Sequence, residues 1–156
     1  MQDQKTSPEK FTIRVYGILI DVAKGILVAD EIQRGLRITK FPGGGLEHGE
    51  GTRDCLVREW MEELNQRIRV TNHLYTTDFF QPSSFDPRQQ VISIYYLVEE
   101  LEQTTIRIAS RPFDFDEVKE DAQSFRWISF KEFHPDMLTL PIDRIAGQII
   151  QQQWCL

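Results

Sequence analysis

The stretch from Val91 to Val98 constrains the fold more than any other part of this sequence. It runs Val-Ile-Ser-Ile-Tyr-Tyr-Leu-Val, and β-branched and aromatic residues of this kind favour extended structure. A strand so uniformly apolar does not suit the edge of a sheet, where one side of it would meet water. The sequence therefore predicts an interior strand around which the rest of the chain must build a sheet.

Other segments with strand character lie on both sides of this run. They cover residues 11–20, 26–29, 36–41, 68–70, 74–80 and 125–128. Two further stretches, 52–64 and 142–154, have the apolar spacing of helices instead. We expect an α/β (α+β) fold in which a mixed β-sheet is sandwiched between α-helices.

Length and composition fit one folded domain. The chain has 156 residues, of which 40% are apolar and 27% are charged. That is the balance of a globular protein, and the length leaves no room for a second sizeable core. We expect a polar, flexible N-terminus over residues 1–10 and a single domain over residues 11–156.

The charge and the apolar pattern argue against several classes of partner. Eighteen basic and 24 acidic residues give a net charge of −6, which disfavours binding to a nucleic-acid backbone. No apolar run approaches the roughly 18–20 residues of a membrane span, and the first residues lack the apolar stretch of a secretory signal. Two cysteines, Cys55 and Cys155, make no disulfide framework, so we expect a reducing, cytoplasmic location.

The helix predicted over residues 52–64 carries an unusual concentration of acid. Glu59, Glu62 and Glu63 are spaced i, i+3 and i+4, which places the three carboxylates on one face. Like charges at this spacing cost a helix roughly 0.2–0.5 kcal/mol per pair, and acids in the last turn oppose the helix dipole. A helix that carries these unfavourable charges without a visible compensating interaction is a candidate functional site. Clustered carboxylate oxygens suit a hard cation such as Mg²⁺.

The other side of this helix is expected to face the core. Val57, Trp60, Met61 and Leu64 form its apolar stripe, and Thr52 is the expected N-cap. A glycine-rich segment, Gly43-Gly44-Gly45, comes shortly before the helix. Glycines permit close approach of the backbone to a ligand, and such a loop leading into a helix suits phosphate groups.

Loop and helix together resemble the signature of the Nudix (MutT-like) hydrolase family. That signature is Gly-x5-Glu-x7-Arg-Glu-U-x-Glu-Glu-x-Gly-U, where U is a bulky aliphatic residue. Its conserved positions fall here on Gly44, Glu50, Arg58-Glu59, Trp60 and Glu62-Glu63. The final Gly-U pair falls on Asn65-Gln66, which departs from the pattern. Asn commonly replaces Gly in a left-handed helix cap, so the first departure is mild.

The resemblance implies an activity and a set of roles. A member of this family is a metal-dependent pyrophosphohydrolase that cleaves a nucleoside diphosphate linked to another moiety, X, by attack of water on phosphorus. It implies that Glu59, Glu62 and Glu63 hold Mg²⁺, with Mn²⁺ as the alternative ion. Arg58 would orient Glu59 through a charge-assisted hydrogen bond. Glu50 would be a structural acid or lie next to the metal.

An acidic loop spans residues 114–121. Family members often supply a further carboxylate, as metal ligand or general base, from the loop before their last strand. Glu120 is the first candidate for this catalytic role and Asp121 the second, while a merely solvated loop remains an open interpretation.

Candidates for contact with substrate lie in several segments. Gly44, Gly45, Arg88 and Phe80 are assigned to substrate binding, with Arg14 as a further candidate for a phosphate. Tyr75, Phe79, Phe80 and Phe85 could stack on a nucleobase, or simply pack in the core.

Two other functions remain open. One is a Nudix domain that senses a nucleotide without hydrolysing it, and the other is an acidic protein-interaction domain with a structural metal. The substrate is a nucleotide-type small molecule in the preferred interpretation, but the sequence does not choose among ADP-ribose, a sugar nucleotide, a dinucleotide or an oxidised triphosphate. A homodimer is likewise left open.

Overall fold

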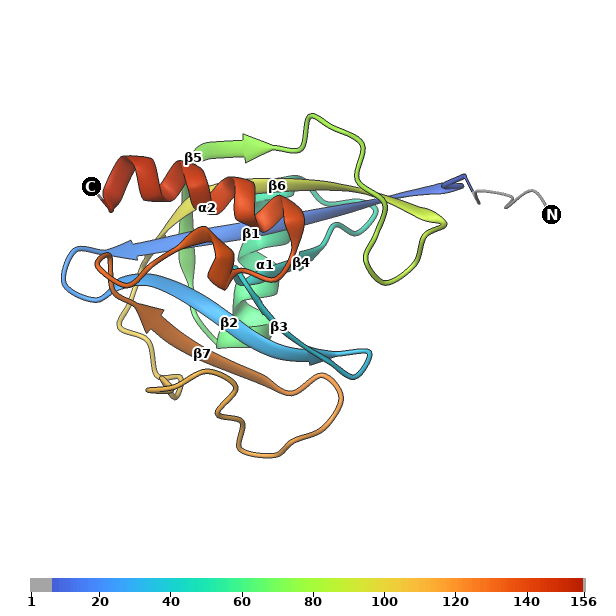
Figure 1. Ribbon diagram of the computed structural model, residues 1–156. Coiled ribbons are helices and arrows are strands. Elements are labelled where there is room, and N and C mark those ends of the chain that lie inside the picture. Colours follow the sequence, from blue (N-terminus) through green and yellow to red (C-terminus); the bar gives the residue numbers. More distant parts are fainter. Residues whose placement is uncertain (1–6, 156) are drawn as a thin grey trace.

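The computed structural model describes residues 7–155, and Figure 1 shows its arrangement of strands and helices. Seven strands and two α-helices make up this part of the chain. The strands are β1 (Lys10–Asp21), β2 (Gly25–Gln33), β3 (Leu36–Lys40), β4 (Gly43–Gly45), β5 (Ile68–Thr76), β6 (Gln89–Glu100) and β7 (Gln123–Ile128). The helices are α1 (Thr52–Leu64), α2 (Pro141–Trp154) and a short 3-10 turn, η1 (Pro135–Met137).

The strands form one mixed sheet with β1 and β6 at its centre. The order is β3-β2-β1-β6-β5, with β4 paired to β1 and β7 paired to β2. β1 and β6 run parallel from the Lys10–Gln89 pair to the Leu19–Val98 pair, and the other pairings are antiparallel. The strand that contains Val91 to Val98 is therefore interior, as predicted.

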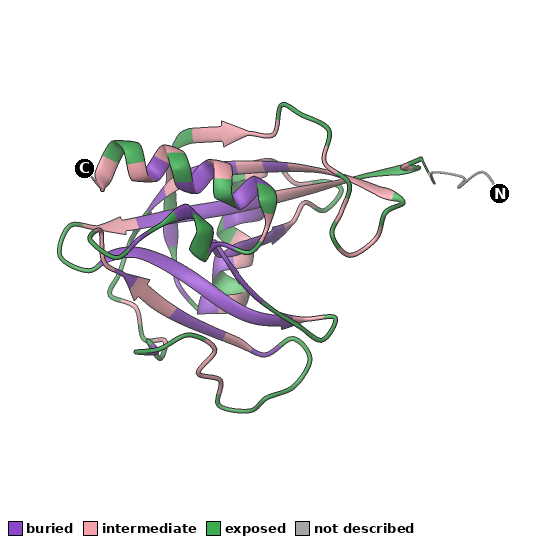
Figure 2. Ribbon diagram, viewed as in Figure 1, coloured by how far each residue is buried: buried purple, intermediate pink, exposed green. Residues whose placement is uncertain are grey.

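The two α-helices cover opposite faces of the sheet (Figure 1). Alternate residues of β1 point to the two sides, so that Val15 packs toward α1 and Tyr16 toward α2. The first core joins Leu56, Trp60 and Leu64 to Leu27 and Val98. The second joins Ile142, Ala146 and Ile150 to Ile18 and Val28. Figure 2 shows that β2 is buried along almost its whole length, whereas β1 and β6 are buried over only part of theirs. The predicted fold, a mixed sheet between helices, is confirmed.

Several boundaries differ from the prediction. The glycines Gly43–Gly45, expected to form a loop, form β4 themselves. β5 is one continuous strand that ends at Thr76, so Phe79 and Phe80 lie in the loop that follows. The predicted flexible segment 1–10 falls largely on residues 1–6, which lie outside the described residues. The backbone amides of Glu9 and Lys10 donate to the carbonyl of Arg88. Within residues 7–155, no helix is long and apolar enough to cross a membrane.

The apolar stripe predicted for α1 is confirmed for Trp60 and Leu64 and wrong for Val57 and Met61. Val57 is 41% exposed and Met61 is 39% exposed, whereas Cys55 and Leu56 are fully buried beside Trp60. The helix is rotated so that Glu59 and Glu63 lie on its inner side, which moves Val57 and Met61 outward. The N-cap is also one residue earlier than predicted. It is Gly51, and the Thr52 hydroxyl hydrogen-bonds the Tyr96 hydroxyl at 2.7 Å.

The end of α1 is set by Asn65, which has left-handed backbone angles of φ 48° and ψ 37°. Its amide donates to the Met61 carbonyl at 3.0 Å, and the next amide reaches the Trp60 carbonyl at 3.5 Å. The side chain of Gln66 is buried and donates to two backbone carbonyls, of Arg67 and Glu102. A polar residue at this position is therefore satisfied without the aliphatic packing that the family signature specifies.

We expect Asn65→Gly to leave stability unchanged or slightly raised and Asn65→Val to lower it. Left-handed backbone costs a residue with a Cβ about 1–2 kcal/mol, most of all a β-branched one, while glycine adopts it freely. Urea unfolding of both variants beside the wild type measures the difference. Equal stability of the two would show that the left-handed cap does not matter.

Candidate active site

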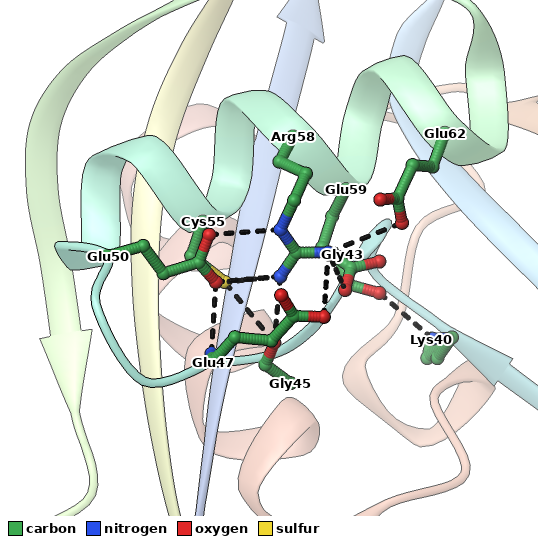
Figure 3. Close-up of polar contacts among 9 residues, drawn as sticks. All are labelled: Lys40, Gly43, Gly45, Glu47, Glu50, Cys55, Arg58, Glu59 and Glu62. Atoms are coloured by element: carbon green, nitrogen blue, oxygen red, sulfur yellow. Dashed lines mark hydrogen bonds and ion pairs between the residues drawn. The ribbon is translucent and has the colours of Figure 1, made fainter.

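Arg58 is the centre of a network that connects four acidic residues (Figure 3). Its guanidinium donates to both carboxylate oxygens of Glu50, from Nε at 2.9 Å and from a terminal nitrogen at 2.7 Å. The other terminal nitrogen donates to Glu59 at 3.1 Å and to Glu62 at 3.2 Å, and lies 3.7 Å from Glu47. A planar guanidinium paired in this bidentate way fixes the directions of its partners. Arg58 therefore makes the predicted hydrogen bond to Glu59, and its role in the reaction stays a prediction.

Glu50 belongs to the framework of the site. Its side chain is 15% exposed and also accepts a hydrogen bond from the backbone amide of Glu47 at 3.0 Å. The hydrogen bonds from Arg58, and then the Glu47 amide, lower the pKa of Glu50 to about 2. A carboxylate that is ionised at neutral pH and accepts from both Arg58 and the Glu47 amide is suited to holding the loop against α1.

Gly44 gives Glu59 the room that it occupies. A Cβ built on Gly44 would lie 2.4 Å from the carboxyl carbon of Glu59 and 2.5 Å from each of its oxygens. The Glu59 side chain is only 13% exposed. The glycine of β4 thus allows the carboxylate of α1 to lie directly against the sheet.

Glu63 turns toward the sheet and has an unpartnered oxygen. Its Oε2 is buried and has no hydrogen-bond partner among residues 7–155. Burial raises the pKa of Glu63 to about 7; the charge of Lys40 opposes this rise and the charge of Glu59 adds to it. An acid held in this way is ready to gain a cation, since neutralising its charge would relieve the cost of burial.

Lys40 is a buried cation whose charge acts on Glu63. Its Nζ lies 3.3 Å from the Glu31 carboxylate and donates to the Gly43 carbonyl at 3.4 Å. Burial alone would lower the pKa of Lys40, but nearby Tyr16, Glu31 and Glu63 outweigh it. The net pKa is raised, so the buried ammonium stays charged.

A cavity of about 340 Å³ connects these groups. Its wall contains three acids, two cations and two amides, namely Glu31, Glu63, Asp121, Arg14, Lys40, Gln33 and Gln123. Acids from α1 and from the loop before β7 therefore face basic residues of β1 and β3. Such a mixed wall can take a cation at the acids and an anionic group beside the bases.

Comparison with known proteins identifies the family. The family model described as NUDIX domain matches residues 10–151, which is most of the chain. The chain belongs to the Nudix family. No curated protein sequence matches it.

Solved structures with the Nudix fold superimpose on the chain. The Escherichia coli ORF135 protein has a TM-score of 0.68 at 19% identity, covering 92% of this chain and 90% of its own. The MutT protein of Methanosarcina mazei has a TM-score of 0.66 at 16% identity, covering 94% of this chain and 96% of its own. An ADP-ribose pyrophosphatase of Streptococcus suis has a TM-score of 0.55 at 16% identity, covering 92% of this chain and 88% of its own. At these identities the likeness shows the fold.

Nudix hydrolases generally use divalent metal ions. Within residues 7–155 no three acidic, histidine or cysteine side chains converge on one point at ligating distance. Glu59 and Glu62 are turned to Arg58, while Glu63 is turned to the cavity. The donor set nevertheless fits a hard cation, because all three are carboxylates and the buried Oε2 of Glu63 lacks a partner. Their assignment as metal ligands stays a prediction.

The structure places three other predicted site residues away from this cavity. Glu120 accepts hydrogen bonds from the backbone amides of Arg34 and Gly35, so it caps the β2–β3 turn, and the neighbouring Asp121 lines the cavity instead. Arg88 is exposed and paired with Asp86, and Phe80 is 61% exposed. Neither lines a cavity that adjoins the carboxylates. Of the substrate candidates, Gly44 lies against Glu59, and the carbonyl of Gly45 accepts from Arg58 at 3.1 Å.

Lys40 and Asp143 are among the buried charged residues that escaped the sequence analysis. Lys40 ends a strand directly before Phe41-Pro42, and Asp143 lies in the first turn of an otherwise apolar helix. Both are almost fully buried, at 3% and 1% exposure. The sequence does hold a signal for both residues. Each is a charged residue at a position where the pattern of its strand or helix predicts an apolar one.

Proposed function

We propose that this protein is a metal-dependent pyrophosphohydrolase that cleaves a nucleoside diphosphate linked to another moiety, X. The observation that carries the proposal is the arrangement around Arg58. It holds Glu59 against Gly44, at the same end of α1 where the unpartnered oxygen of Glu63 meets a cavity lined by Arg14 and Lys40.

Each group in this arrangement has a chemical task. Glu59, Glu62 and Glu63 would hold Mg²⁺, or Mn²⁺ in its place, and the ion would supply charge neutralisation at the phosphates and lower the pKa of water. Arg14 and Lys40 bind phosphate oxygens from the opposite wall and offset charge that develops on the leaving group. Arg58 and Glu50 keep Glu59 in position.

The proton of the attacking water needs an acceptor. Glu59 is one candidate, and the loop before β7 supplies the other. In that loop Glu120 is engaged by two backbone amides, whereas Asp121 faces the cavity. We therefore place Asp121 ahead of Glu120 for this role. The products are a nucleoside monophosphate and X-phosphate.

The first test is metal dependence. Nucleoside diphosphate compounds such as ADP-ribose, sugar nucleotides, dinucleotides and oxidised triphosphates are incubated with the protein and Mg²⁺ or Mn²⁺, and the released products are measured. We expect turnover with metal and none in excess EDTA, because the carboxylates can act on phosphates only through a cation. Full activity in EDTA would contradict the assigned role of the three glutamates.

The same assay separates the alternatives. A sensing domain would raise its melting temperature with a nucleotide but release no product, and a protein-interaction domain would do neither. A cytoplasmic location is part of the proposal and is supported by the two free thiols of Cys55 and Cys155. We propose no nucleic-acid or membrane partner, in keeping with the net charge of −6; a homodimer is left to a measurement of mass in solution.

A further inference from the structure

The loop before β7 places two neighbouring acids in different surroundings, and Figure 1 shows this loop beside the turn between β2 and β3. Glu120 binds that turn. One of its carboxylate oxygens accepts from the backbone amide of Arg34, and the other accepts from the amide of Gly35 at 3.0 Å. Asp121, the next residue, lines the cavity of about 340 Å³ at the glutamates of α1, whereas Glu120 does not line it. Any effect of Glu120 on that cavity must therefore be indirect.

The backbone of Asp121 has a conformation that is unusual for its residue type. Asp121 is the third residue of a turn, which is closed by the hydrogen bond from the Ala122 amide to the Lys119 carbonyl at 3.1 Å, and its φ is +64°. Glycine is the common residue at such a position, because a Cβ disfavours left-handed backbone. An aspartate there is strained relative to glycine, and an observed departure of this kind is a reason to infer a function.

Hydrogen bonds hold this turn against the end of β2. The Asp121 amide donates to the Ile32 carbonyl at 2.9 Å, and the Ile32 amide donates to the Ala122 carbonyl at 3.0 Å. Glu120 adds its two side-chain contacts to the turn that follows Ile32 by two residues. The segment 120–122 is thereby fastened to residues 32–35 by both backbone and side chain.

The β2–β3 turn is a firm support for this contact. Its two central residues both have left-handed backbone, with φ of 49° at Arg34 and 75° at Gly35, as a tight hairpin turn requires. The Arg34 guanidinium donates to the Phe85 carbonyl and lies 5.9 Å from the centre of the Phe85 ring. The amides of the two central residues are free of the strand ladder, so Glu120 gives them the acceptor that they need.

We propose that Glu120 is a positioning residue, which binds the β2–β3 turn and so holds the Asp121 carboxylate at the wall of the cavity. Without this contact, the turn over residues 119–122 would relax to a backbone that suits an aspartate better, and the carboxylate would leave the cavity. Glu120 thus acts on the reaction through Asp121 and takes up no proton itself. The inference deepens the proposed function, because it rests on Asp121 accepting the proton of the attacking water.

Hydrogen exchange tests the positioning without any substrate. Exchange of the Arg34, Gly35 and Asp121 amides is followed by NMR in the full chain and in Glu120→Ala. We expect all three amides to exchange at least about tenfold faster in the variant, because the turn loses its acceptor and the loop loses its support. Glu117→Ala is the matched control, since the Glu117 side chain is 74% exposed in the same loop, and it should leave the three rates unchanged. Unchanged exchange at Asp121 in Glu120→Ala would overturn the proposal.

Steady-state kinetics with Mg²⁺ test the effect on the reaction, with the compound of the substrate panel that is turned over fastest. Glu120→Ala should lower kcat at least about tenfold and change KM by less than about twofold, because Glu120 supports the proton acceptor and does not touch the substrate. Glu120→Gln should recover part of the loss, since its amide oxygen can still accept from a backbone amide. A lower melting temperature in Glu120→Ala with an unchanged kcat would show that Glu120 only stabilises the fold, and would overturn the proposal.

Asp121→Gly shows whether the effect passes through Asp121. Glycine suits the left-handed position, so this variant should melt no lower than the wild type, while kcat should fall at least about a hundredfold. Adding Glu120→Ala should cause little further loss, because the carboxylate that Glu120 positions is already absent. Losses that multiply in the double variant would overturn the proposal.

Failure of the proposed function gives a different result. A wild type that turns over no compound of the panel would contradict the hydrolase activity. Faster exchange at Asp121 in Glu120→Ala would in that case still support the positioning of Asp121 by Glu120, because exchange is measured without turnover.

Discussion

Glu63→Gln should raise the stability of the metal-free protein and abolish most of its catalysis. The folded protein holds Glu63 with a pKa of about 7, well above the ordinary value near 4.5, chiefly because the acid is buried. Because the pKa of Glu63 is higher in the folded than in the unfolded protein, the folded protein loses stability as the pH rises from about 4.5 to about 7 and Glu63 becomes ionised. The Gln side chain of the variant has nearly the same shape but does not ionise, so its stability does not fall over this pH range. At pH 8 the variant should therefore gain roughly 1–2 kcal/mol, and at pH 4.5 it should gain almost nothing.

Metal should reverse the order of stability. With Mg²⁺ the wild type gains binding free energy that the variant largely lacks, so its melting temperature should rise above that of the variant. Turnover should fall by at least about a hundredfold, since the lost ligand acts on the charged transition state. Thermal melts at both pH values, with and without Mg²⁺, are compared with a turnover assay.

Glu117→Gln is the control for this experiment, because Glu117 is 74% exposed in the loop before β7. It should change neither melting temperature nor rate by a measurable amount. If Glu63→Gln behaves in the same way, Glu63 takes no part in metal binding and its assignment to the metal site is wrong.

The sequence could predict the sheet and the acidic helix because both leave a local pattern. The apolar run of β6 requires an interior strand. The helical spacing of apolar residues over 52–64 predicts where α1 begins and ends. The left-handed cap at Asn65 follows from one residue type at one position. Each of these inferences needs only neighbours in the chain.

The parts that the sequence could not give depend on partners far apart in the chain. Val57 was expected in the core because apolar residues usually face inward, but the room that Gly44 leaves brings Glu59 there instead. Gly44 lies on a strand beside β1, a pairing that no local pattern reveals. The choice between Glu120 and Asp121 likewise depends on the β2–β3 turn, whose amides take up Glu120. Spacing along the chain cannot give contacts of this kind.

Gly44→Ala should reduce turnover by about a hundredfold or more while leaving the protein folded. The added methyl group would lie within 2.5 Å of both carboxylate oxygens of Glu59, so this side chain must move away. Its movement would also break the hydrogen bond from Arg58 at 3.1 Å. A displacement of about 1 Å in a catalytic group can cost about two orders of magnitude in rate. The folding cost should be modest, because the displaced atoms are at the end of a flexible side chain.

Two further variants show whether the effect acts through Glu59. Gly51→Ala is the matched control, since a Cβ there would meet nothing closer than 3.8 Å, and an N-cap change from Gly to Ala costs roughly 0.5–1 kcal/mol of stability without touching Glu59. It should keep the turnover of the wild type. In a Glu59→Gln background, Gly44→Ala should cause little further loss, because the group that it displaces is already disabled. If the two losses instead multiply in the double variant, Gly44 affects the reaction by a route other than the position of Glu59. Full turnover of Gly44→Ala alone would show that the carboxylate need not lie against the sheet.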